Sequence, residues 1–342
     1  MSKKYPSIGT RRGPRHDRGA ALVLALALLA FMAIMGTAYV RFMDLETQEA
    51  DFDLARLRAH EGAQAGMYAA LAQLSDAYAE GQAHFLTAEP QEFTFPVYRR
   101  QSDSGRRGFS PDERRRTNVR VTVSDENAKI NLNTAPAPVI AAVLDVDDET
   151  AEAIVAAQPR GDGVKPASLR PADAEGKARQ WLFTLEDLRK RGLLTAEQFE
   201  QVDRELVTTF STLPFDDAAE SLNVNRAPAR VLAIALGIDP EKARELVAYR
   251  QEKPFRNAKA LQLAAGKKRA DFPITGKGAT PDIPGTRSHC FRLMSQSIFV
   301  HDAEDGSVLG RAHARVEGVV RFNDDGSYET IYWNSEQAKG NG

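Results

Sequence analysis

The sequence predicts an α+β protein in which a long N-terminal helix packs on an antiparallel sheet and a large all-α domain is inserted into that sheet. Three observations predict this class. An unbroken apolar run at 20–40 passes directly into a one-sided helical pattern. Strand-like segments lie on both sides of a helical middle, and that middle contains an internal duplication. The chain has 342 residues and is 42% apolar, which is enough for one membrane helix and two modest folded parts.

The first two segments are a basic leader at 1–19 and an apolar helix at 20–40. The leader carries six Lys or Arg against one Asp. The 21 helical residues span about 31 Å, close to the roughly 30 Å of hydrocarbon in a bilayer. The positive charge keeps the leader cytoplasmic and sends the chain after Arg41 across the membrane. A secretory signal peptide is the competing interpretation, but the run is longer than the apolar region of such a peptide, and no small-residue cleavage motif closes it.

The helical pattern continues through 41–81 as an amphipathic stalk helix. Apolar residues recur at spacings of three, four and seven, and Gly81 supplies a C-terminal stop. A helix that is apolar all round and then apolar on one side predicts lipid around its first half and a protein body against its second half. The apolar stripe consists of Phe42, Leu45, Phe52, Ala55, Ala59, Ala63, Met67, Ala70, Leu71 and Leu74.

We predict one antiparallel sheet, packed on this helix, that is formed by two separated parts of the chain, 82–133 and 289–334. The last residues, 335–342, are predicted to be a tail. Alternating side chains and two Asp-Gly turns indicate the sheet. A polar, Arg-rich loop is expected at 99–117, between the first two strands. The expected strands are 93–98, 118–123, 291–294, 297–300, 312–322 and 328–333.

The region 134–288 is predicted to be the inserted domain, with repeats at 131–156 and 223–248 that align without a gap at an offset of 92 residues. Each repeat begins with Asn-x-Asn-x-Ala-Pro. The proline opens a first helix and an Asp caps a second one, so each repeat is predicted to be a helix-hairpin-helix unit. The hairpin positions are Asp147 in the first repeat and Gly237 and Asp239 in the second.

Helix-hairpin-helix units often bind DNA through a glycine-rich hairpin that offers main-chain N–H groups to a phosphate. The first hairpin, 144–149, has no glycine and four carboxylates, and 134–156 contains no Lys or Arg. The second hairpin keeps Gly237 but has Asp239 where the second glycine would stand. Because phosphate contacts dominate affinity for nucleic acids, we interpret the repeats as structural modules and expect no nucleic-acid partner.

Composition argues against several other classes. The net charge is −2, or about −7 without the leader, which disfavours a polyanionic partner. The single cysteine, Cys290, excludes an intrachain disulfide and is expected to be buried at a strand start. The six histidines are scattered, and neither His-Glu-x-x-His nor Cys-x-x-Cys occurs. The sequence therefore predicts no enzyme, with no catalytic residue to assign.

The chain has a basic leader ending in Arg18-Gly19, an apolar helix from Ala20, paired Asn-x-Asn-x-Ala-Pro repeats and a strand-rich C-terminal part. Together these features resemble protein K of the type II secretion system, the large minor pseudopilin. The resemblance implies a pilin-like sheet, cleavage by a prepilin peptidase between Gly19 and Ala20, and N-methylation of Ala20. Pseudopilins generally carry Glu at the fifth mature position, where this chain has Leu24. An unpaired carboxylate is costly inside a bilayer, so leucine suits a tip subunit with no neighbour above it. The alternative is that Leu24 is an ordinary membrane-facing residue of a plainly anchored protein.

The resemblance implies a minor pseudopilin at the tip of the pseudopilus, which initiates and caps assembly for the export of folded proteins across the outer membrane. The implied partners are the minor pseudopilins I and J, the major pseudopilin, the prepilin peptidase and the inner-membrane assembly platform. The implied location is the inner membrane, single-pass, with a cytoplasmic N-terminus and a periplasmic head. Two alternatives stay open: a membrane-anchored helix-hairpin-helix DNA receptor, and a minor pilin of a related type IV pilus.

Calcium is the one cofactor that the resemblance leaves open, because members of this family can bind it and loops rich in carboxylates suit the ion. None of the acidic clusters has EF-hand spacing, and helix caps or hairpin turns explain several of the acids, so no metal ligand is assigned. The resemblance does not account for the Arg-rich segment 106–116 or the insertion 158–176. The acidic clusters are Asp145/Asp147/Asp148/Glu149, Asp216/Asp217, Asp302/Glu304/Asp305 and Asn323/Asp324/Asp325.

Overall fold

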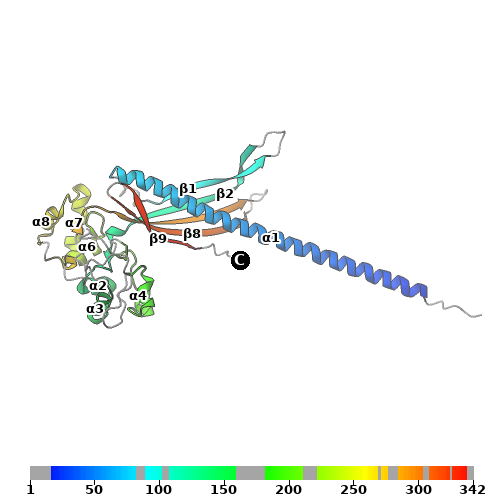
Figure 1. The fold of residues 1–342 in the computed structure, drawn as a ribbon, viewed down its shortest axis with the longest axis horizontal. Helices are drawn as coiled ribbons and strands as arrows, with labels where there is room; N and C mark the ends of the chain where they lie inside the picture. The colour runs from blue at the N-terminus through cyan, green and yellow to red at the C-terminus, as the bar shows by residue number, and fades with distance from the viewer. Residues whose placement is uncertain are drawn as a thin grey trace, which may run out of the picture.

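The computed structural model shows a long helix, α1 (Asp17–Ala79), lying along a five-stranded sheet, with a lobe of short helices at one end of the sheet (Figure 1). The 63 residues of α1 extend for about 95 Å. The N-terminal half of α1 projects beyond the sheet, on the side away from the lobe (Figure 1). The structure describes residues 17–81, 89–101, 108–158, 182–210, 222–268, 271–275, 284–302, 308–323 and 326–336.

Helix α1 packs on the sheet from Ala55 onward. The residues of the predicted stripe from Ala55 to Leu74 are buried, whereas its first three, Phe42, Leu45 and Phe52, are exposed. Contact between α1 and the sheet therefore begins further along the helix than the start of the apolar stripe at Phe42. Hydrophobic periodicity identifies the apolar face of a helix, but it does not identify what packs on that face. Glycines allow the helix to approach closely, since a Cβ added at Gly66 would lie 2.4 Å from Cγ1 of Val119.

The sheet is antiparallel throughout, with the strand order β1-β2-β7-β8-β9. The early and late parts of the chain meet in the β2–β7 pair, where Val121 lies opposite Ser295. One face of the sheet, which includes Val121, Leu293 and Val316, forms a core with α1. The predicted long helix on an antiparallel sheet is thereby confirmed. The strands are β1 (Gln91–Gln101), β2 (Gly108–Asp125), β7 (Cys290–Asp302), β8 (Val308–Phe322) and β9 (Tyr328–Glu336).

The loop predicted at 99–117 is wrong, because most of this segment is strand. β1 and β2 remain paired as far as Gln101 opposite Gly108, with an irregularity between Pro96 and Val97. Main-chain hydrogen bonds can extend an antiparallel hairpin without apolar side chains, so the polar, Arg-rich composition gave no strand signal.

The two strands predicted at 291–294 and 297–300 are a single strand, β7. The apparent break falls at Ser295 and Gln296, of which Ser295 is buried on the face that meets α1. The Ser297 hydroxyl donates a hydrogen bond to the main-chain carbonyl of Ala59 in α1. The polar residues at 295 and 296 therefore looked, in the sequence, like the end of a strand, although Ser295 is buried between β7 and the helix.

The segment between β2 and β7 forms the lobe, which has an apolar core of its own, including Ile140, Ile154 and Leu232. The lobe departs from the all-α expectation, because it contains two short parallel pairs, β3 with β4 and β5 with β6. The helices are α2 (Ala137–Leu144), α3 (Asp148–Ala157), α4 (Glu186–Lys190), α5 (Ala196–Glu200), α6 (Ala229–Leu236), α7 (Pro240–Glu252) and α8 (Ala258–Ala265). The short elements are η2 (Glu126–Ala128), β3 (Ile130–Asn131), β4 (Val207–Thr208), β5 (Leu222–Asn223), η5 (Pro273–Thr275) and β6 (Pro284–Gly285).

Candidate functional site

The first candidate region is the exposed apolar half of α1. Among the described residues, α1 is the one helix that is long and apolar enough to cross a membrane, with a mean hydropathy of 2.4 over the tested window and none of that window buried. Leu24 is 70% exposed, and Gly19 and Ala20 lie in the first turn of α1. An apolar helix surface of this extent is stable only against lipid or other apolar helices.

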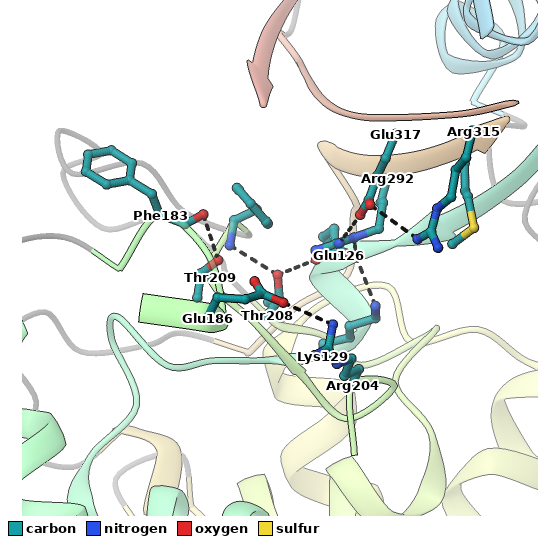
Figure 2. A network of polar contacts seen from close by, with 12 residues as sticks. Glu126, Lys129, Phe183, Glu186, Arg204, Thr208, Thr209, Arg292, Arg315 and Glu317 are labelled. Carbon is teal, nitrogen blue, oxygen red and sulfur yellow. Dashed lines mark hydrogen bonds and ion pairs between the residues drawn. The ribbon is translucent and has the colours of Figure 1, made fainter. Parts of the chain in front are cut away.

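The second region is the junction between the sheet and the lobe, which centres on Glu126 of η2 (Figure 2). The Glu126 side chain is fully buried. Its Oε1 accepts hydrogen bonds from Lys129 Nζ and Arg292 Nε, each at 3.0 Å, and its Oε2 accepts one from the Thr208 hydroxyl. Arg292 belongs to β7 and also pairs with Glu317 of β8. Glu126 therefore connects the sheet to a segment of the lobe through charged hydrogen bonds.

Opposite charges decide the ionisation of this buried cluster. Burial would raise the pKa of Glu126, but Lys129 and Arg292 outweigh it, and the pKa of Glu126 is lowered. Burial would lower the pKa of Arg292, but Glu126 and Glu317 raise it. The Arg292 guanidinium also lies over the ring of Phe210, 5.2 Å from the ring centroid. Glu126 and Arg292 are thus held as a charged pair that removal of one partner would leave uncompensated.

Two further contacts fix the start of β7 at the same junction. The Asn127 Oδ1 accepts hydrogen bonds from the main-chain N–H groups of His289 and Cys290, at 2.9 and 2.8 Å. Cys290 is the first residue of β7, is buried, and donates from Sγ to the carbonyl of Phe210. The expectation of a buried cysteine at a strand start is confirmed. Burial, followed by the nearby Glu126 and Asp125, raises the pKa of the Cys290 thiol well above its ordinary value, so the sulfur stays protonated and unreactive.

The second asparagine of each Asn-x-Asn motif holds a distant segment by hydrogen bonds from both ends of its amide. Asn133 donates to the carbonyls of Leu182 and Thr209, and accepts from the N–H of Leu182. Asn225 donates to the carbonyl of Phe255 at 2.9 Å and accepts from its N–H at 2.8 Å. The sequence showed the motif, but these partners lie too far along the chain to be inferred from it.

The hairpin residues lie on the surface of the lobe, between the two helices of each repeat. Asp145 has a φ of 54°, and Gly237, its counterpart 92 positions later, has a φ of 58°. Asp147 is the N-cap of α3 and accepts from the N–H of Thr150 at 2.7 Å, which lowers its pKa. Asp239 occupies the N-cap position of α7, where its side chain makes no capping hydrogen bond. The left-handed turn is therefore common to both hairpins, whereas the side-chain cap is present in the first alone.

The acidic residues of the first hairpin do not fit a calcium site. In the part of the chain that the structure describes, no group of three or more His, Cys, Asp or Glu side chains is placed to hold a metal ion. Asp147 already serves as a helix cap. Asp216, Asp217, Glu304, Asp305, Asp324 and Asp325 lie outside the described residues.

Helix α1 is apolar and exposed in its first half and packs on an antiparallel sheet in its second half. This arrangement is typical of a protein that has one membrane anchor and a folded head. The family described as "Type II secretion system (T2SS), protein K" has a model that matches residues 130–166 and 222–276, the regions of the two repeats. This match confirms the resemblance to protein K, a minor pseudopilin of type II secretion, that the sequence predicts.

A chain of the GspK–GspI–GspJ complex from the type 2 secretion system of enterotoxigenic Escherichia coli is similar in structure, with 14% sequence identity and a TM-score of 0.44. That comparison covers 82% of this chain and 98% of the other. No curated protein matches this sequence.

Proposed function

We propose that this protein is the tip subunit of the type II secretion pseudopilus, a minor pseudopilin that initiates and caps the assembly through which folded proteins cross the outer membrane. The observation that carries the proposal is the family match over both repeats. The exposed apolar half of α1 supports it, because a pseudopilin subunit must first rest in a membrane and then pack against other apolar helices.

The position of the lobe supports placement at the tip. The lobe lies at the end of the sheet opposite the projecting half of α1 (Figure 1). In a filament whose subunits are stacked along their long helices, a subunit added beyond this end would meet the lobe. Leu24 supports the same placement, since a residue with no subunit above it has no partner for a carboxylate.

In this proposal, 20–40 span the inner membrane, 1–19 form a cytoplasmic leader, and the remaining chain is a periplasmic head. The head consists of the stalk 41–81, a pilin-like sheet from 82–133 and 289–334, and the inserted domain 134–288. Its partners are the minor pseudopilins I and J, the major pseudopilin, the prepilin peptidase and the inner-membrane assembly platform. The role is structural, one of assembly and not of catalysis.

Intact-mass analysis tests the proposed processing. When the full chain is produced together with a prepilin peptidase, we expect the mass to fall by residues 1–19 and to rise by one methyl group on Ala20. Gly19→Val should leave the leader uncut, whereas Gly13→Val, a matched change within the leader, should be processed normally. An unprocessed wild-type chain in the presence of active peptidase contradicts the proposal.

Co-purification tests the proposed assembly. The processed chain, extracted in detergent, should bring down the minor pseudopilins I and J. Binding of duplex DNA with a steep dependence on salt, in place of those partners, would instead identify a DNA receptor. The exposed carboxylates Asp145 and Asp147 of the first hairpin oppose that outcome.

A further inference from the structure

Two consecutive acids, the last residue of β2 and the first of η2, attach different parts of the lobe to the sheet. Glu126 holds β4 through the Thr208 hydroxyl. Asp125 holds the segment that precedes β7, because its Oδ2 accepts a hydrogen bond from the Ser288 hydroxyl. Ser288 in turn accepts one from Asn223 of β5, at 2.6 Å. Asp125 is therefore connected, through Ser288, to the second repeat.

The groups that surround the two acids differ in charge. Glu126 forms ion pairs with two cations. Asp125 accepts its hydrogen bonds from uncharged groups, the Ser288 hydroxyl and the N–H of Asn127, and attraction by Arg226 is a smaller effect. The negative charge of Glu126 is therefore well compensated inside the protein, whereas that of Asp125 is not.

Asp125 also borders a cavity of about 940 Å³, which lies where the end of α1, the second repeat and the start of β7 meet. Tyr78 lines the cavity from the side of α1. Gln251 and Arg287, which line it as well, are exposed, so the cavity is open to water. A small separation of the second repeat from the sheet would therefore hydrate Asp125.

The ionisation of the two acids follows this geometry. Burial raises the pKa of Asp125 to about 6, whereas for Glu126 the effect of burial is outweighed by Lys129 and Arg292 and the pKa is lowered. If the second repeat moved away, the hydrated Asp125 would regain a pKa near 3.8. The closed arrangement is thus most favoured while Asp125 is protonated, and it becomes less favoured as the pH rises to about 6.

Other charged or titratable groups surround Asp125 on every side. The arginines among them stay protonated at these pH values. The Tyr78 hydroxyl lies 2.7 Å from Nδ1 of His289, and histidine is itself sensitive to pH near neutrality, so an experiment has to separate it from Asp125. The surrounding groups are Tyr78 of α1, Glu126 of η2, Arg226 after β5, Arg250 of α7, and Arg287, His289 and Cys290 at the start of β7.

We propose that the attachment at Asp125 is a pH-sensitive contact between the second repeat and the sheet. While Asp125 is protonated, the segment 284–289 and the second repeat rest closed on the sheet, and once Asp125 is ionised they separate from it more often. The attachment at Glu126 does not respond in this range and keeps the lobe in place. The inference concerns the folded head alone and does not depend on the tip role proposed above.

Hydrogen exchange of the full chain in detergent, followed by mass spectrometry, tests the proposal. Exchange is compared at about pH 5 and about pH 7.5, after correction for the intrinsic effect of pH on exchange. We expect the corrected exchange at 222–226 and 284–289 to rise about tenfold between these values, because ionisation favours the open form. Exchange at 130–131 and 207–208, beside Glu126, should not change. This comparison within the wild type needs no variant.

Variants assign the effect to one group. Asp125→Asn keeps the shape of the neutral acid, so it should remove the pH dependence and hold exchange at the level seen in acid. Asp203→Asn changes an exposed acid of the lobe and is the matched control, and it should behave as the wild type does. His289→Gln should also keep the pH dependence. An equal effect at both attachments, no effect at 284–289, an effect that persists in Asp125→Asn, or its loss in His289→Gln overturns the proposal.

Discussion

Asp125 is a buried acid held in an environment that opposes its charge. Burial, only partly offset by hydrogen bonds from Ser288 and from the N–H of Asn127, raises its pKa to about 6 from an ordinary value near 3.8. The unfolded chain therefore releases this proton at a lower pH than the folded chain does. The contribution of Asp125 to stability is at its most favourable below about pH 4 and declines as the pH rises to about 6.

Asp125→Asn gives a direct test of this titration. The free energy of unfolding of the wild type, relative to the variant, should fall by up to about 3 kcal/mol between pH 4 and pH 7. Urea unfolding of the full chain in detergent, followed by tryptophan fluorescence, measures the difference. A difference that stays constant or rises with pH shows that Asp125 is not destabilised by burial.

At the scale of single elements, the contact of α1 with the sheet depends on residues that lack side chains. A Cβ at Gly66 would approach Cγ1 of Val119 to 2.4 Å, closer than folded proteins allow, so the helix or the strand would have to move. Gly36 lies in the projecting half of the same helix, with nothing within 4 Å of its Cβ position. The two glycines therefore separate helix propensity from packing.

We expect Gly66→Ala to destabilise the head and Gly36→Ala to leave it unchanged. Overpacking costs about 1–3 kcal/mol, of which helix propensity returns up to about 1 kcal/mol. The midpoint of thermal unfolding, measured by circular dichroism on the full chain in detergent, compares the two variants with the wild type. Equal midpoints for Gly66→Ala and Gly36→Ala would refute the close packing of α1 on β2.

The hairpins of the two repeats show how far a structural element can be predicted from its amino-acid sequence. Gly237 at a left-handed turn is a familiar stop signal, and the sequence located it. Asp145 adopts nearly the same φ without being glycine, which aspartate tolerates better than most residues. The sequence could not show that the Asp239 side chain makes no capping hydrogen bond. Aspartate is a favoured N-cap residue, and both repeats have aspartate at this position.

At the scale of the whole molecule, the long helix, the split sheet and the place of the inserted region followed from hydrophobic periodicity and turn residues. The polar contacts at the junction between the sheet and the lobe did not follow from these signals. Glu126, Thr208 and Arg292 are separated by tens of residues, and each alone looks like an ordinary polar residue. Hydrogen bonds between residues so far apart in the chain leave no local pattern in the sequence. The extended β1–β2 hairpin left no pattern either, because its polar strands differ from a loop only in their main-chain partners.

Breaking the junction should affect sheet and lobe together. Arg292→Met leaves the charge of Glu126 buried with one partner fewer, and we expect it to lower the free energy of unfolding by about 3–5 kcal/mol. Hydrogen exchange of the full chain should show loss of protection in β7, η2 and β4 at once. Arg120→Met, an exposed change on β2, is the control and should shift stability by less than about 0.5 kcal/mol. Loss of protection confined to β7 contradicts a shared junction.

The unbroken length of α1 has a mechanical consequence. A continuous helix of 63 residues, with its C-terminal part packed along the strands, behaves as a stiff rod attached along its side. A pull on its projecting end is delivered to the sheet as shear, which many side-chain contacts resist at the same time, and not as peeling from one end. The junction then passes the load to the lobe, so a force applied inside the membrane would move the far end of the head without unfolding what lies between.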